Sequence, residues 1–115
     1  EDRLKIINNS LFKDLKLNKK KIKVIPFGNL TIDLCKKYNA STIIRGLRAV
    51  SDFEYEFQLA GMNKKLNTKI ETMFLMSDVE NQIISSKFVK EIASLGGNIN
   101  RFVTKSTVKE LKNKF

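Results

Sequence analysis

The pattern of hydrophobic and polar positions predicts helices that alternate with strands. Hydrophobic residues first recur at helical spacing, at Leu4, Ile7, Leu11 and Leu15. This spacing predicts an amphipathic helix over about residues 2 to 14. The segment from Lys21 to Phe27 then alternates isoleucine and valine with lysine, which predicts a strand that ends at Pro26 and Gly28.

Local signals set the bounds expected for the later elements. Gly46 is expected to end a short buried strand, and Ser51 to Glu54 reads as a capping box. The expected elements, in chain order, are a helix over Leu30 to Tyr38 with a left-handed residue at Asn39, a strand over Thr42 to Ile44, a helix from the capping box to about Leu66, a strand over Ile70 to Met76, a helix from Ser85 or Ser86 that Gly96 and Gly97 end, and a last helix capped by Thr107.

Alternating strands and helices predict an α/β fold with a parallel sheet covered on both faces. Ligands in such folds bind beyond the carboxyl ends of the strands, here the loops after Phe27, Ile44 and Met76. The length of 115 residues and a hydrophobic content of 42% indicate one folded domain over residues 1–115. The sequence has no signal-peptide pattern and no apolar run near the roughly 20 residues that span a bilayer, so we expect a cytoplasmic protein without a membrane partner.

Net charge and cysteine content limit the kinds of ligand and site that the chain can have. The net charge of +10 suits anionic ligands, and it leaves open either a nucleic-acid partner or an ordinary solvated basic surface. Cys35 is the only cysteine and histidine is absent, so neither an internal disulfide nor a thiolate zinc site can form. The apolar neighbours of Cys35 favour a small buried side chain over a nucleophile.

Two groups of residues suit phosphate binding. Arg45 and Arg48 flank Gly46 after a strand, and guanidinium groups bind phosphate oxygens at two points. The same arginines could instead pair with acidic residues of the next helix, at Asp52, Glu54 or Glu56. Ser85 and Ser86 open a helix, where free N–H groups favour an anion, although ordinary capping explains them equally well.

Aromatic residues alternate along one predicted helix, at Phe53, Tyr55 and Phe57. Side chains at these positions cannot all face one core, so some should contact a ligand or another subunit. Core packing remains the default interpretation for each of them.

Taken together, these stretches resemble the bacterial phosphopantetheine adenylyltransferases, in order and over essentially the whole chain. The runs that carry the resemblance are Asn29 to Asp33, Ile44 to Ala60, Met62 to Leu66, Phe74 to Met76, Ile84 to Ser86, Phe88 to Ala93, Leu95 to Gly97, and Phe102 with Val103. The resemblance implies a Rossmann-like nucleotidyltransferase fold. It also implies transfer of an adenylyl group from ATP to 4′-phosphopantetheine, giving dephospho-coenzyme A and pyrophosphate with Mg²⁺ present.

The resemblance also implies roles for individual residues. Arg45 would hold the phosphate of phosphopantetheine, and the other residues near that substrate would be Leu30, Thr31, Asn63 and Glu91. ATP would contact Gly46, Leu47, Arg48, Glu56, Asn81, Gln82, Ile83, Ile84, Ser85, Ser86 and Lys87. Coenzyme A itself would be a further ligand, the assembly would be a hexamer, and no nucleic acid would take part.

The chain departs from the family pattern at Ser77, Asn81 and Lys87, which makes its ATP site the least typical part. The family's Gly-Thr-Phe-Asp-Pro and Gly-His motifs are absent, so the catalytic histidine is expected upstream and no catalytic residue in this chain. The first two strands would be missing as well, which would leave Lys21 to Phe27 without a neighbour in a sheet of order 3-2-1-4-5. A related nucleotidylyltransferase with another phosphorylated acceptor, or an RNA-binding module, remain the alternatives.

Overall fold

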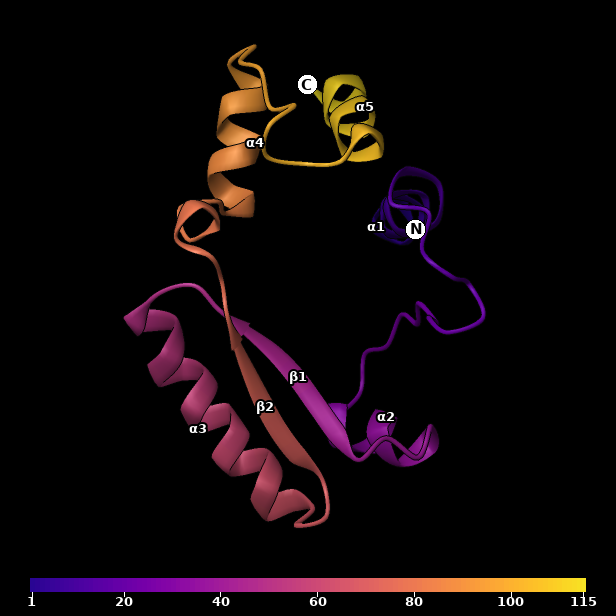
Figure 1. Ribbon diagram of the computed structural model, residues 1–115, viewed down its shortest axis with the longest axis vertical. Coiled ribbons are helices and arrows are strands. Elements are labelled where there is room, and N and C mark those ends of the chain that lie inside the picture. Colours follow the sequence, from indigo (N-terminus) through magenta and orange to yellow (C-terminus); the bar gives the residue numbers. More distant parts are fainter. The chain divides into compact units, whose positions relative to one another are not determined.

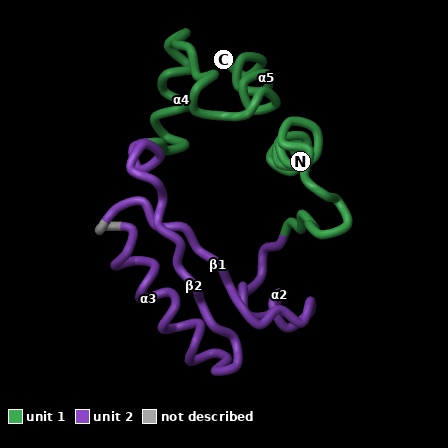
Figure 2. Tube along the Cα trace, viewed as in Figure 1, with its two compact units in different colours: residues 1–26, 84–115 green, residues 27–83 purple. Residues whose placement is uncertain are grey.

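The computed structural model describes residues 1–49 and 52–115, which form two compact units (Figure 2). Unit 1 consists of Glu1–Pro26 and Ile84–Phe115, and unit 2 consists of Phe27–Ile83. The single domain expected over residues 1–115 stays a prediction.

Unit 2 is an α/β unit built on two parallel strands (Figure 1). Its elements are helix α2 (Thr31–Lys37), strand β1 (Thr42–Leu47), helix α3 (Val50–Leu66), strand β2 (Glu71–Met76) and a short 3-10 helix, η2 (Val79–Asn81). Thr42 pairs with Glu71 and Leu47 with Met76 at the two ends of the strands. The α/β fold with a parallel sheet is therefore confirmed.

The bounds in unit 2 follow local sequence signals closely. Helix α2 lies within one residue of its prediction at each end, and Asn39 has the expected left-handed backbone, with φ of 55°. Helix α3 ends at Leu66 as expected, and strand β2 starts one residue later than expected. Ser51, the cap expected for α3, lies outside the described residues.

The core of unit 2 lies where helix α2 meets the start of each strand. Ile32 and Cys35 from α2 are buried against Ile70, and the half-buried Ile43 packs on this cluster. Cys35 is thus a buried hydrophobic residue, as its neighbours predicted.

Unit 1 is helical. Its elements are helix α1 (Asp2–Asn8), a π-helical segment η1 (Asn9–Asp14), helix α4 (Ser86–Ser94) and helix α5 (Lys105–Lys114). Helix over residues 2 to 14 is confirmed, although its second half is π-helical. Helix α4 begins and ends as predicted, and Gly96 after it has a φ of 81°, which favours glycine.

Three local predictions are wrong. No strand is present over Lys21 to Phe27 in the described chain, because a strand requires a hydrogen-bonded neighbour and none pairs with this segment. Strand β1 does not end at Ile44: it continues through Gly46, which pairs with Leu75 of β2. Helix α5 is capped by Thr104, whose hydroxyl accepts a hydrogen bond from the N–H of Thr107, the expected cap.

In the part of the chain that the structure describes, no helix is long and apolar enough to cross a membrane.

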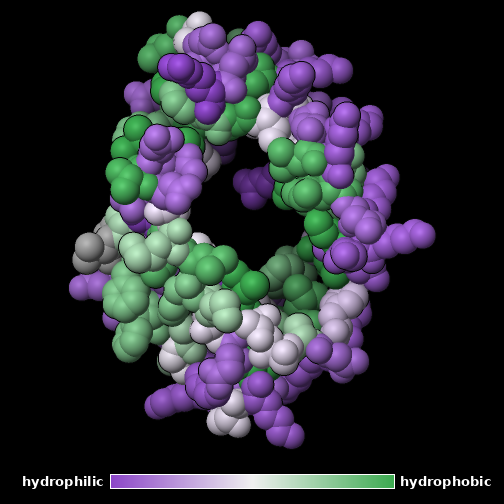
Figure 3. Space-filling model, in the orientation of Figure 1, coloured by the Kyte–Doolittle hydropathy of each residue, from purple (hydrophilic) through white to green (hydrophobic). Residues whose placement is uncertain are grey.

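Figure 3 shows hydrophobic residues gathered over the strands and helix α3 of unit 2. Two aromatic residues of α3 are largely exposed, Tyr55 at 63% and Phe57 at 62%.

Candidate functional site

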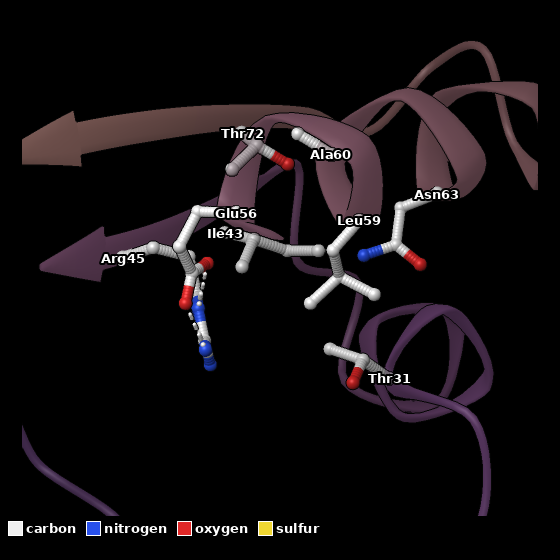
Figure 4. Close-up of a pocket in the computed structure, with 8 residues that line it drawn as sticks. All are labelled: Thr31, Ile43, Arg45, Glu56, Leu59, Ala60, Asn63 and Thr72. Carbon is white, nitrogen blue, oxygen red and sulfur yellow. Dashed lines mark hydrogen bonds and ion pairs between the residues drawn. The ribbon is translucent and has the colours of Figure 1, made fainter. Parts of the chain in front are cut away.

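A small pocket in unit 2 brings together residues from four elements (Figure 4). Its cavity volume is about 30 Å³, roughly the volume of one water molecule. Its lining residues are Thr31 of α2, Ile43 and Arg45 of β1, Glu56, Leu59, Ala60 and Asn63 of α3, and Thr72 of β2. Three of the residues implied for phosphopantetheine, Thr31, Arg45 and Asn63, therefore line one pocket although the chain separates them widely.

Strand and helix periodicity together explain the composition of the pocket. Side chains alternate between the two faces of a strand, so Ile43 and Arg45 share the face that helix α3 covers. On α3, Glu56, Ala60 and Asn63 follow one another at spacings of four and three residues, which places them on one side of the helix. Arg45 thus lies within a strand, beside α3, rather than in the loop that the sequence predicted.

The centre of the site is a two-point ion pair between Arg45 and Glu56. Arg45 donates from Nε to Oε2 at 2.8 Å and from Nη2 to Oε1 at 2.6 Å. The side chain of Glu56 is only 10% exposed, whereas that of Arg45 is 45% exposed. The pair thus has a buried acidic side and an accessible basic side.

Electrostatics in this pair favour the two charged forms. The hydrogen bonds from Arg45 lower the pKa of Glu56 below its ordinary value, against burial, which acts in the opposite direction. The same hydrogen bonds raise the pKa of Arg45. The carboxylate therefore stays ionised although it is buried.

Arg48 follows strand β1 and forms a more exposed pair with Asp52. Its Nε lies 3.5 Å from Oδ2 of Asp52, and its backbone N–H donates to the same oxygen at 3.3 Å. Both pairings were alternatives to phosphate binding, and the structure contains both. Neither excludes a ligand, because an arginine that donates to one carboxylate keeps further N–H donors.

The other residues of unit 2 to which the resemblance gives a role in substrate binding differ in accessibility. Leu30 is the exposed N-cap residue of α2, next to Thr31 of the pocket. Gly46 has open space where a Cβ would stand, so the described chain leaves room for a ligand there. Leu47 is buried and its carbonyl oxygen accepts a hydrogen bond from Ser77, so little of this residue is accessible.

Residues after strand β2 form a compact turn in unit 2. Asn81 ends the 3-10 helix, and Gln82 donates from Nε2 to the carbonyl oxygen of Ser77 at 3.3 Å. Ile83, the last residue of unit 2, is highly exposed. The role implied for these three residues in ATP binding stays a prediction.

The remaining implied residues, Ile84 to Lys87 and Glu91, belong to unit 1. Ser85 caps helix α4, because its Oγ accepts a hydrogen bond from the N–H of Phe88 at 3.2 Å. Ser86, Lys87 and Glu91 line one groove along this helix. The capping interpretation of Ser85 is therefore confirmed, and anion binding by this segment stays a prediction.

Sequence reasoning missed four residues of the pocket: Ile43, Leu59, Ala60 and Thr72. The alternation of β1 could have placed Ile43 beside Arg45, and helical spacing could have placed Leu59 and Ala60 near Glu56 and Asn63. Thr72 had no such signal, because its position depends on the register between the two strands.

The described residues contain no group of three or more histidine, cysteine, aspartate or glutamate side chains that could hold a metal ion. Magnesium, however, needs no such group when a nucleotide brings it. It then keeps phosphate and water ligands and takes one or two from the protein.

Comparisons with known proteins first define the class. The model of the cytidylyltransferase-like family matches residues 2–92, which include both parallel strands and the pocket between them and α3. Proteins called phosphopantetheine adenylyltransferase are similar over more of the chain. The chain belongs to this family of phosphopantetheine adenylyltransferases, within the cytidylyltransferase-like class.

Three relatives illustrate the degree of similarity. The phosphopantetheine adenylyltransferase of Pelagibacter ubique is 68% identical over 99% of this chain, which spans 70% of that relative. That of Rhodospirillum rubrum is 52% identical over 90% of this chain, which spans 59% of it. That of Roseobacter denitrificans is 47% identical over 99% of this chain, which spans 69% of it.

Proposed function

We propose that this chain is part of an enzyme that transfers an adenylyl group from ATP to 4′-phosphopantetheine. The products are dephospho-coenzyme A and pyrophosphate. One observation supports this function above all: Thr31, Arg45 and Asn63, which the family resemblance assigns to the acceptor, come from three separate elements and line one pocket.

The side chains that line the pocket suit contact with an acceptor that has a phosphate at one end and an amide-containing arm. The accessible guanidinium of Arg45 can bind a phosphate dianion by charge-assisted hydrogen bonds. The hydroxyl of Thr31 and the amide of Asn63 can bind the polar groups of the arm, and Leu59 with Ala60 supplies apolar contact. The site would thus recognise the phosphate of phosphopantetheine and part of its arm.

The reaction requires position and charge rather than a covalent intermediate. A phosphate oxygen of the acceptor attacks the α-phosphorus of ATP, a new P–O bond forms, and the bond to the β-phosphate oxygen breaks so that pyrophosphate leaves. Arg45 would hold the attacking phosphate in line, which accelerates such a step by removing freedom of motion. No side chain of this chain need change its bonds.

ATP would be held near the carboxyl end of strand β1, by the accessible backbone at Gly46 and by Arg48. The family resemblance also assigns ATP to residues 81 to 87, where Lys87 supplies a charge that the family pattern lacks, and it assigns the acceptor to Glu91. Mg²⁺ would enter with ATP, bound chiefly by phosphate oxygens and water.

We further propose that the enzyme is a hexamer and acts in the cytoplasm, where ATP is plentiful. The exposed aromatic residues Tyr55 and Phe57 of α3 support assembly, because large exposed apolar surfaces commonly mark interfaces.

Pyrophosphate release by the whole protein tests the function. Release should require both ATP and 4′-phosphopantetheine, and mass spectrometry should find dephospho-coenzyme A. Other phosphorylated acceptors serve as controls. Release with one of these and not with 4′-phosphopantetheine would instead identify a related nucleotidylyltransferase.

A further inference from the structure

The family resemblance implies that Glu56 contacts ATP. We propose that Glu56 is in addition a positioning residue for Arg45, and that it acts through Arg45 on the acceptor's phosphate. This inference rests on the proposed function, since it assumes that Arg45 binds that phosphate.

Both oxygens of Glu56 are engaged by Arg45. Oε1 and Oε2 each accept a hydrogen bond from Arg45, at 2.6 and 2.8 Å, and the side chain is only 10% exposed. Two of the roughly four acceptor positions of the carboxylate are therefore used to hold one guanidinium group.

Arg45 offers the complementary surface. The pair uses Nε and one hydrogen of Nη2, which is one edge of the planar guanidinium group. Nη1 makes no hydrogen bond to any residue that the structure describes. The edge formed by Nη1 and Nη2 therefore remains for an anion, and a phosphate can accept from it at two points.

Fixing one edge of the guanidinium orients the other. A free arginine side chain samples many rotamers, and a two-point contact to a buried carboxylate removes much of that freedom before the ligand arrives. Glu56 itself comes from the middle of helix α3, a rigid element. The pair is thus prepared to bind phosphate in one geometry.

The negative charge of Glu56 has an opposing effect on phosphate binding. Glu56 neutralises part of the charge of Arg45, so its removal would raise the local positive potential and could tighten phosphate binding. The guanidinium is 45% exposed, and water screens this effect at such a position. We therefore expect the loss of orientation to dominate.

Two substitutions separate orientation from charge. Glu56→Gln removes the charge and one of the two acceptors. Glu56→Asp keeps the charge, but its carboxylate is one methylene shorter and cannot make both hydrogen bonds without a shift of the backbone. Glu54→Gln, at an exposed position on the same helix, is the matched control.

Calorimetric titration of the whole protein with ATP, 4′-phosphopantetheine and pantetheine, which lacks the phosphate, tests the inference. For both Glu56 variants we expect the Kd of 4′-phosphopantetheine to rise on the order of 10-fold. The Kd of pantetheine should stay within about twofold of wild type, and that of ATP should rise less than that of 4′-phosphopantetheine. All three Kd values should stay within about twofold of wild type for Glu54→Gln. Unchanged binding of pantetheine also shows that the variant is folded.

Other outcomes would overturn the inference. A larger loss for ATP than for phosphopantetheine would place Glu56 at the nucleotide, and equal losses for pantetheine and its phosphate would show a structural role. If phosphopantetheine binding becomes tighter in Glu56→Gln and does not become tighter in Glu56→Asp, Glu56 acts only as a counter-charge to Arg45. The proposed function is tested separately, because it fails only if wild-type protein does not release pyrophosphate from the two substrates.

Discussion

Asp14 accepts, through Oδ2, a hydrogen bond of 2.8 Å from the backbone N–H of Ser106, 92 positions further along the chain. Ser106 lies in the first turn of helix α5, where backbone N–H groups have no partner within the helix. Thr104 caps the same turn, and its hydroxyl also lies 2.6 Å from that of Ser10. Two segments of unit 1 are thus joined through the start of one helix.

Removing this contact should destabilise unit 1. Asp14→Ala should lower the Tm, because it leaves the N–H of Ser106 without its acceptor. Asp78→Ala is a matched control, since the structure shows no capping hydrogen bond from that side chain. Differential scanning calorimetry measures both, and an equal Tm for Asp14→Ala and wild type would contradict the importance of this cap.

Acid should weaken unit 2 through the Arg45–Glu56 pair. The folded-state pKa of Glu56 lies below its ordinary value of 4.5, so the pair's contribution to stability is fully present above pH 4.5. It is lost as the pH falls through the lowered pKa, while Arg45 stays charged throughout. Urea unfolding as a function of pH should show this loss in wild type and a smaller one in Glu56→Gln. If the free energy of unfolding depends on pH identically in wild type and Glu56→Gln below pH 4.5, this prediction is contradicted.

The exposed aromatic residues of α3 should support assembly. Tyr55 is more exposed than Phe53, which packs on the rings of Phe57 and Phe74 at centroid distances of 5.7 and 6.4 Å. Light scattering on the whole protein should give a hexamer, and Tyr55→Asp should shift it towards smaller species without lowering activity per folded subunit. Wild-type protein that is only monomeric would contradict the proposal.

The two serines of helix α4 should have different roles. Ser85→Ala should destabilise the protein by about 1 kcal/mol, because Oγ caps the helix. Ser86→Ala should leave stability nearly unchanged and, if this hydroxyl binds ATP phosphate, raise the Kd of ATP roughly 2- to 10-fold. Thermal unfolding and calorimetric titration separate the two effects. Unchanged ATP binding in Ser86→Ala would leave capping as the only role of this pair.

The sequence predicted the structure most accurately where the signal depends on neighbouring residues. The bounds of α2, α4 and β2 agree within a residue, and Asn39 and Gly96 have the left-handed backbone expected of them. Such features depend on a few neighbouring residues, and the same physics acts in an isolated segment. The parallel sheet followed from the order of these elements alone.

Features that depend on a partner distant in sequence were predicted less well. Residues 21 to 27 have a strand pattern but no neighbouring strand, whereas β1 extends through Gly46 because β2 pairs with it. The pattern identified three acids as possible partners of Arg45, and only the structure selects Glu56, eleven positions away. Asp14, far from α5 in sequence, had no local signal at all.

Arg45 of strand β1 and Arg48, just after it, provide the sharpest test of the site, because the proposal gives them different ligands. Arg45→Ala should weaken 4′-phosphopantetheine more than ATP, by roughly 10- to 150-fold, the range of a charge-assisted hydrogen bond. Arg48→Ala should mainly weaken ATP. Lysine should restore either position poorly, because an ammonium group cannot donate at two fixed points.

Stability must be measured with affinity, since Arg45→Ala also leaves the buried Glu56 without its partner, whereas the Arg48–Asp52 pair is more exposed. The double variant Arg45→Ala, Glu56→Gln removes that buried charge. It should regain stability relative to Arg45→Ala and still bind phosphopantetheine weakly. Equal losses for both substrates in both single variants would refute the division between the arginines. Unchanged affinities would mean that the two arginines bind neither substrate and serve structural pairs such as those with Glu56 and Asp52.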